Sequence, residues 1–342
     1  MVAKLHTCGL LNNSFRPPEQ IRALRCYLRP RENLVQQAGT CIQQMPKSLT
    51  EMNLPLANGI SDRSGMTGMK ILQAILEGER DPRKLAALAD IHVHASRKEI
   101  AQSLEGHWRE EGLFVRQQVQ EMYYTCLEKI RECDERMERQ LRAITAKVDP
   151  TVRPLPAARA KNRLPKRKHI PQFDLRAELY RITGVDLTQI DGINVQTAQV
   201  VISEVGVDMN RWPTEAHFAS WLGLSPNNEI TGGKVIRRGT RRVLNRATVA
   251  LRVAAQTLHH SKTALGVKYR RFRARLGAPK AITVMAHHLA CLIYRMLRFG
   301  SEYHDKGMQH YERKYRETQM KWLQKQAAAL NMQLIQAQAV PK

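Results

Sequence analysis

Apolar residues recur at alternating steps of four and three along one stretch of this 342-residue chain. Residues on one face of a helix repeat every three or four positions, so the pattern predicts one long helix over 107–149. The spacing favours a coiled coil, most simply in a homodimer, and the alternative is a helix that packs on its own domain. The stripe consists of Val119, Tyr123, Cys126, Ile130, Cys133 and Met137, continued after one extra step of four by Leu141, Ile144 and Val148.

Residues 1–106 also have the spacing of helices joined by turns. Pro17-Pro18-Glu19 is typical of a helix start, and apolar residues with helical spacing continue from there to Met45. Pro30 and Pro46 lie inside this pattern, and a proline inside a helix costs about 3 kcal/mol. We therefore expect kinks or breaks at both prolines, and a charged turn over 78–82.

A basic, proline-rich segment at 150–173 predicts an exposed linker that can lie along phosphates. Its cations are Arg153, Arg159, Lys161, Arg163, Lys166, Arg167 and Lys168. After it we expect a compact helical C-terminal domain over 174–306 and a glutamine-rich helical tail over 307–342. The predicted fold class is mainly α.

The start of the C-terminal domain has the pattern of a helix-hairpin-helix, Leu187-x-x-Ile190-Asp191-Gly192-Ile193-Asn194. In this motif a glycine turn directs backbone N–H groups at a phosphate, so Gly192 and Asn194 are predicted phosphate contacts. Asn194 stands where the usual form has glycine, and asparagine tolerates the left-handed backbone conformation. The alternative is a hairpin that serves only for packing.

The charge of the chain points to a polyanionic partner. It has 55 Lys and Arg against 31 Asp and Glu, a net charge of +24, and residues 230–301 contain 16 cations and no acid. Like charges destabilise a helix unless an anion lies against them, so we expect nucleic acid as the partner. An idle basic surface is the alternative. An anionic membrane surface fits less well, because the basic helices lack a broad aromatic and leucine face.

Other classes of protein are disfavoured by what the sequence lacks. No apolar run approaches the roughly 18 residues of a membrane span, and no secretion signal opens the chain. The six cysteines form no C-x-x-C pair, which argues against a zinc site and a disulfide framework. The pairs His259-His260 and His287-His288 point to different faces of a helix, so no metal site is predicted. We expect a soluble, reduced, cytoplasmic protein.

Several motifs together resemble one protein family. Upstream, these are Leu5-His6-Thr7, Arg31-Glu32-Asn33-Leu34 and Gly78-Glu79-Arg80-Asp81-Pro82. Downstream, they are Leu222-Gly223-Leu224-Ser225-Pro226, Ile230-Thr231-Gly232-Gly233-Lys234 and Arg237-Arg238-Gly239-Thr240-Arg241-Arg242. This order resembles the insertion-sequence transposases that combine a DEDD nuclease-like domain with a serine domain, the IS110 family.

The resemblance implies cutting and rejoining of DNA strands, guided by a structured RNA. In that family, four acidic residues of the nuclease-like domain bind a divalent metal such as Mg, and a serine attacks a DNA phosphate. Thr231 stands at the serine position, and Ser225 is a nearby substitute. Because Met1 falls where the last acidic pair should already have passed, we expect a truncated copy that binds DNA, without a cofactor of its own. A non-enzymatic architectural protein is the alternative.

The segment around Thr231 is predicted to hold DNA. Its two glycines allow the backbone to approach a phosphate closely. If the following helix reaches back to Arg238, then Arg238, Arg242 and Arg246 share one face. The alternative is that the arginine stems cover apolar surface. The predicted DNA contacts are Gly232, Gly233, Lys234, Arg237, Arg238, Arg241, Arg242 and Arg246.

Overall fold

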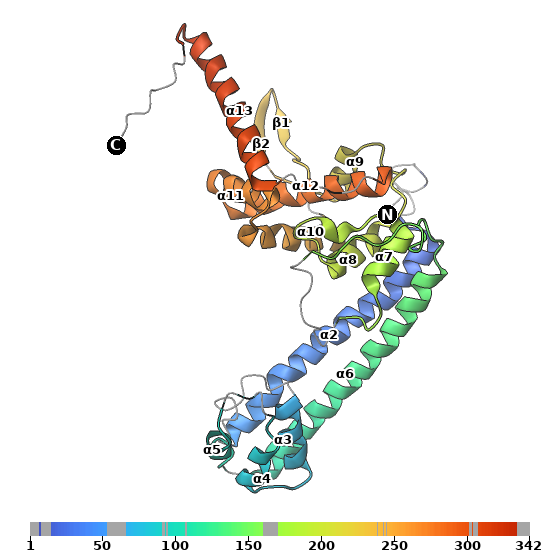
Figure 1. Ribbon diagram of the computed structural model, residues 1–342, viewed down its shortest axis with the longest axis vertical. Helices are drawn as coiled ribbons and strands as arrows, with labels where there is room; N and C mark the ends of the chain where they lie inside the picture. Colours follow the sequence, from blue (N-terminus) through green and yellow to red (C-terminus); the bar gives the residue numbers. More distant parts are fainter. Residues whose placement is uncertain are drawn as a thin grey trace. The chain divides into compact units, whose positions relative to one another are not determined.

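A computed structural model describes residues 7, 15–52, 66–90, 93, 95–106, 108–159, 170–237, 239–241, 243, 245–300, 303 and 307–333. These residues are mainly helical with two short strands, so the predicted mainly α fold class is confirmed. Contacts divide the chain into two units, whose elements are labelled in Figure 1. Unit 1 comprises residues 1–22, 141–165 and 174–342, and unit 2 comprises residues 23–140 and 166–173.

Unit 2 is built on two long antiparallel helices, α2 (Glu19–Glu51) and α6 (Glu110–Ala143), which lie side by side in Figure 1. The long helix predicted from the apolar stripe is therefore present as α6. Within the chain the stripe packs on α2, which is the alternative that the sequence left open, and pairing with a second copy remains a prediction. Its partners across the seam are on α2: Ala38, Cys41 and Met45 form one buried cluster with Tyr123, Cys126 and Ile130.

The prolines of α2 do not break it. The helix is continuous from Glu19 to Glu51 with Pro30 and Pro46 inside, so the expected breaks are wrong. Each proline removes a backbone hydrogen bond at a cost of about 3 kcal/mol. The buried cluster against α6 offsets this cost, because apolar burial contributes about 25 cal/mol per Å² and several large side chains take part.

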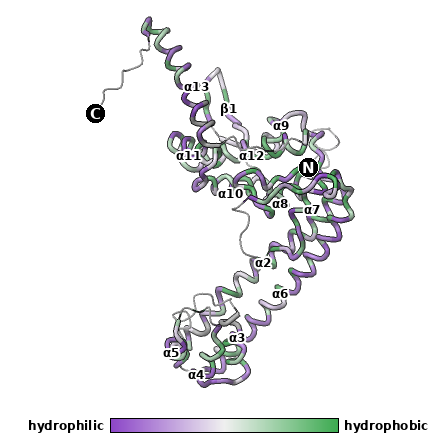
Figure 2. Tube along the Cα trace, in the orientation of Figure 1, coloured by the Kyte–Doolittle hydropathy of each residue, from purple (hydrophilic) through white to green (hydrophobic). Residues whose placement is uncertain are grey.

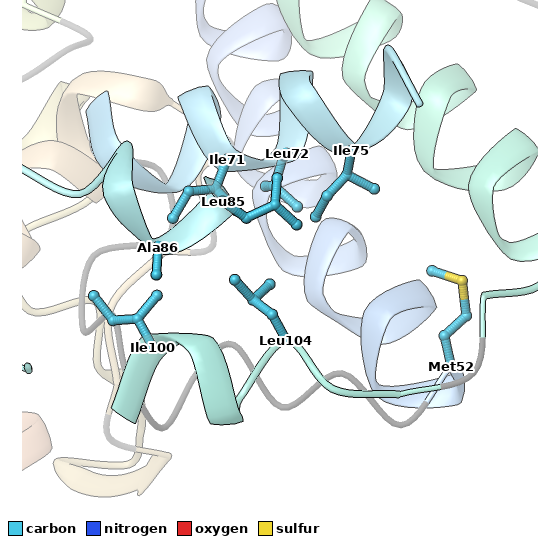
Figure 3. Close-up of a cluster of buried hydrophobic side chains, with 8 residues drawn as sticks. All are labelled: Met52, Ile71, Leu72, Ile75, Leu85, Ala86, Ile100 and Leu104. Carbon is cyan, nitrogen blue, oxygen red and sulfur yellow. The ribbon is translucent and has the colours of Figure 1, made fainter. Parts of the chain in front are cut away.

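In the rest of unit 2, the described residues form three short helices, α3 (Met66–Leu76), α4 (Pro82–Ala87) and α5 (Arg97–Gln102). The turn predicted over 78–82 is confirmed: Gly78 has a φ of 101°, and Asp81 caps α4 by accepting a hydrogen bond from the Arg83 N–H at 2.9 Å. Figure 3 shows the buried side chains that join these helices: Met52, Ile71, Leu72, Ile75, Leu85, Ala86, Ile100 and Leu104.

Unit 1 contains the remaining elements, and α12 (Ala278–Phe299) packs on three of its helices, α9, α10 and α11. Buried residues on α12 follow helical steps of four, at Ala281, Met285, Leu289, Ile293 and Leu297. The hydropathy of each residue is shown along the chain in Figure 2. The other helices of unit 1 are α7 (Leu175–Thr183), η3 (Leu187–Gln189), α8 (Val195–Val205), α9 (Glu215–Trp221), α10 (Arg246–Thr257), η4 (Leu258–His260), α11 (Ala264–Leu276) and α13 (Gly307–Ala329).

The linker expected to be exposed is partly packed. Arg159 is half-buried, donates a hydrogen bond to the Gln189 carbonyl at 2.6 Å and lies 3.5 Å from the Asp191 carboxylate. The Pro156 carbonyl accepts a hydrogen bond from Arg176 at 2.7 Å. The expected exposure is therefore wrong for Arg159. The linker cations from Lys161 to Lys168 lie outside the described residues.

Candidate nucleic-acid interface

The segment predicted to lead into a basic helix is instead a β-hairpin. Strands β1 (Glu229–Thr231) and β2 (Lys234–Arg237) pair antiparallel, with Thr231 opposite Lys234. Gly232 and Gly233 form the two-residue turn, with φ values of 56° and 76°. A turn of this kind requires positive φ at both positions, which glycine adopts without strain. Two glycines between short apolar runs are a hairpin signal that sequence reasoning missed.

Contacts between its two legs hold the base of the hairpin together. The Asn227 N–H donates to the Gly239 carbonyl at 2.7 Å, and Pro226 forms a bridge with Thr240. Below this bridge, Gly223 has a φ of 66°, and a Cβ there would lie 2.9 Å from the Arg241 carbonyl oxygen. The two legs of the hairpin therefore run closely together where they join α9 and α10, and its tip projects from a fixed base.

Helix α10 starts later than the arginine spacing suggested. Asn245 caps it by accepting a hydrogen bond from the Ala247 N–H at 2.8 Å, so Arg246 is the first helical residue. The expectation that Arg238, Arg242 and Arg246 share a helical face is therefore wrong. Arg238 and Arg242 lie outside the described residues.

The start of α10 nevertheless suits an anion. Arg241 and Arg246 are exposed, and the first turn has no acidic residue. A helix N-terminus carries partial positive charge and attracts anions, and the exposed guanidinium groups add positive charge at the same place. A bound phosphate is an anion of this kind.

Several cations of the acid-free stretch have partners within unit 1, which corrects the view that all sixteen are uncompensated. Arg295 forms two hydrogen bonds with the Glu215 carboxylate, and these bonds lower the pKa of Glu215. Arg270 donates to the Ser261 carbonyl at 2.6 Å, and Arg298 donates to the Met209 carbonyl at 3.1 Å. These three arginines hold the fold together, so the surface for a partner is smaller than the sequence suggested.

The predicted phosphate turn near Gly192 faces the protein. Gly192 has a φ of 89°, and a Cβ there would lie 2.9 Å from the Ala254 carbonyl oxygen of α10. Asn194 is extended rather than left-handed, and its side chain caps α8 by accepting from the Thr197 N–H at 2.7 Å. Asp191, directly before Gly192, is buried and accepts hydrogen bonds from the Ser261 and Thr263 hydroxyls. Gly192 thus packs closely on α10, as the packing alternative expects, and its contact with a phosphate remains a prediction.

The two candidate hydroxyl groups differ in access. Thr231 is exposed at the end of β1, directly across the ladder from the exposed Lys234. Side chains opposite each other in an antiparallel pair have Cβ atoms about 5 Å apart, so the hydroxyl and the ammonium can approach the same phosphate. Ser225 is half-buried in the loop that precedes the hairpin. The geometry thus favours Thr231 over Ser225 for contact with a large partner.

Among the described residues, no group of three or more His, Cys, Asp and Glu side chains could hold a metal ion. Within the same part of the chain, no helix has both the length and the apolar character to cross a membrane.

Comparisons with known proteins concern the part of the chain that contains the hairpin. Residues 186–270, which run from η3 through the hairpin into α11, match the family described as "Transposase IS116/IS110/IS902 family". The chain is 31% identical over 140 residues to the "Insertion element IS110 uncharacterized 43.6 kDa protein" of Streptomyces coelicolor. That match covers 40% of this chain and 33% of the relative, so the chain spans about a third of the relative's length. Over these parts of its length the chain is similar to insertion-sequence proteins of this kind.

Proposed function

We propose that this protein acts in the transposition of an insertion sequence and that unit 1 holds DNA on the hairpin and at the start of α10. The observation that carries the proposal is the family match over 186–270, because it contains both features. The exposed cations Lys234, Arg241 and Arg246 lie within this range, and the stretch from Ile230 to Ser301 contains no acid to repel a phosphate. Such a surface binds the phosphate backbone of nucleic acid.

Salt dependence of binding tests this surface. Affinity for DNA should fall with salt, with a logarithmic slope of about −0.9 for each phosphate that the protein neutralises on a duplex. Changing Arg241 and Arg246 to Gln should make the slope shallower by about one for each phosphate that is no longer neutralised. Arg131→Gln on the exposed face of α6 is the matched control and should leave the slope unchanged. Equal slopes for all three proteins would reject the surface.

The Thr231 hydroxyl is proposed to meet a DNA phosphate at the hairpin tip. If it is the nucleophile, it forms a phosphodiester bond with the phosphate and releases the 3′ or 5′ hydroxyl of the cut strand. Incubation with element-end DNA and Mg²⁺, followed by denaturing electrophoresis, should then show a covalent adduct that Thr231→Ser retains and Thr231→Ala lacks. An absent adduct with unchanged DNA affinity would instead favour a non-enzymatic architectural protein.

A structured RNA is proposed as a second ligand of the same basic surface, on the resemblance to the family. RNA transcribed from the element should compete with DNA for binding, and the Arg241 and Arg246 variants should weaken both ligands together. Loss of only one ligand would place the two on different surfaces. The homodimer remains a prediction.

A further inference from the structure

The β-hairpin exposes large apolar side chains that packing within the described chain does not cover. Ile230 is 62% exposed and Ile236 is 71% exposed. Ile230 lies opposite Val235 in the ladder. The register shifts between Glu229 and Ile230, so Ile236 is the extra residue of a β-bulge and has no residue opposite it. A two-stranded hairpin is marginally stable alone in water, and clustered exposed apolar side chains often mark an interaction site. The exposed apolar side chains therefore mark the hairpin as a candidate contact surface for a partner.

The surrounding charge identifies this partner as a polyanion. Lys234 is exposed at the tip, and Arg241 is exposed where the hairpin joins unit 1. The acid of β1, Glu229, lies 3.6 Å from the guanidinium of Arg237, so its charge is offset locally. A groove of duplex DNA admits a two-stranded β-ribbon, and bent complexes often have an isoleucine inserted between neighbouring base pairs. Apolar side chains flanked by cations suit this geometry.

The tip of the hairpin also has room for such an approach. A Cβ added at Gly232 or Gly233 would meet no heavy atom within 4 Å, so the described chain leaves the turn open. The base is held by the bridge between Pro226 and Thr240. A projecting tip on a fixed base can enter a groove without rearrangement of the helices.

We propose that Ile230 and Ile236 insert between base pairs of a DNA duplex and that the protein therefore prefers sites with a pyrimidine–purine step. The proposal rests on the DNA-binding function proposed above. Separating stacked bases costs a few kcal/mol per step, and TA and CA steps separate more easily than the stiff steps of an A-tract. Inserted isoleucines would thus select a sequence without hydrogen bonds to base edges.

Fluorescence of 2-aminopurine tests the insertion. Two duplexes of equal length carry the probe, one beside a central TA step and one inside an A-tract, and anisotropy gives the affinity for each. The full chain should raise the emission of the TA duplex and bind it more tightly, by on the order of fivefold. The variant Ile230→Ser/Ile236→Ser should lose both effects but keep its salt slope, because its cations remain.

The matched control is Val249→Ser/Val253→Ser on α10, whose side chains are 59% and 58% exposed. It should keep both the emission increase and the preference. The single variant Ile236→Ser guards against misfolding, and all variants should show the thermal unfolding of the parent, since the changed side chains are exposed.

Three results would overturn the proposal. Binding of both duplexes without an emission increase excludes insertion and leaves the proposed function intact. A serine variant that keeps the preference for the TA duplex also excludes insertion by the isoleucines and leaves the proposed function intact. A serine variant that loses mass in light scattering but keeps the emission increase assigns the isoleucines to a protein contact. Failure of the parent chain to bind either duplex would instead reject the proposed function.

Discussion

The buried ion pair between Arg31 of α2 and Asp134 of α6 offers a direct test of the helical pair in unit 2. Both side chains are 6% exposed, and the guanidinium contacts both carboxylate oxygens, the second at 3.2 Å. Asp134→Ala leaves Arg31 as a buried charge without this partner, which should cost about 3–5 kcal/mol. The double variant Arg31→Met/Asp134→Leu should cost far less, because apolar side chains of similar size fill the same space.

Hydrogen exchange of peptides from α2 and α6 measures the effect in unit 2 alone. A loss of 3–5 kcal/mol corresponds to roughly a 10²- to 10⁴-fold drop in protection. The control is Glu135→Ala, which removes an exposed ion pair with Arg131 at 3.9 Å and should cost less than about 1 kcal/mol. If Asp134→Ala lowers protection no more than Glu135→Ala, the pair is not buried in solution and the packing of α2 on α6 is wrong.

Three further predictions concern the packing of both units. Burial favours the protonated form of Asp186, but hydrogen bonds from Arg176, Thr188 and Gln189 outweigh it and lower the pKa of the carboxyl group. The ionised carboxylate therefore stabilises the fold above about pH 4, and this contribution is lost as the pH falls through the lowered pKa. The difference in melting temperature between the parent and Asp186→Asn should shrink between pH 6 and pH 3. Gly192→Ala should destabilise unit 1 by about 1–3 kcal/mol in urea unfolding, because the methyl group meets the Ala254 carbonyl at a positive φ, whereas Gly233→Ala on the open turn should cost less. Ile130→Asp should lower the helical circular dichroism at 25 °C, since the charge enters the cluster between α2 and α6; a change in mass alone would show that α6 pairs between chains.

The sequence was most informative where the signal is local. The spacing of Tyr123, Cys126 and Ile130 predicted the buried face of α6, because helical periodicity depends only on near neighbours. It could not identify the covering surface, since a stripe on α2 and a stripe on a second copy present the same pattern. The partner of Arg295 was equally hidden, because Glu215 lies 80 residues away in the chain.

At the candidate site, local sequence signals for a hairpin and a helix cap were present, but the spacing of the arginines was given more weight. Gly232-Gly233 indicates a hairpin, and Asn245 is a typical helix cap before Arg246. The regular spacing of the arginines favoured a helix instead, and the exposed isoleucines of the hairpin were therefore not predicted. Spacing of charged residues is weaker evidence than turn chemistry, because a charge tolerates many backbone conformations whereas two positive φ angles do not.

The carboxylate of Asp191 has a consequence for the order in which unit 1 forms during synthesis. It pairs with Arg159, 32 positions earlier, and with the hydroxyls of Ser261 and Thr263, 70 and 72 positions later. A chain emerging from its N-terminus presents the carboxylate and the arginine first, and the hydroxyls only after the hairpin and α10 have been made. Until then the turn around Gly192 also lacks α10, the surface on which it packs. The turn around Gly192 can therefore reach its final packing only after the chain has been made as far as Thr263.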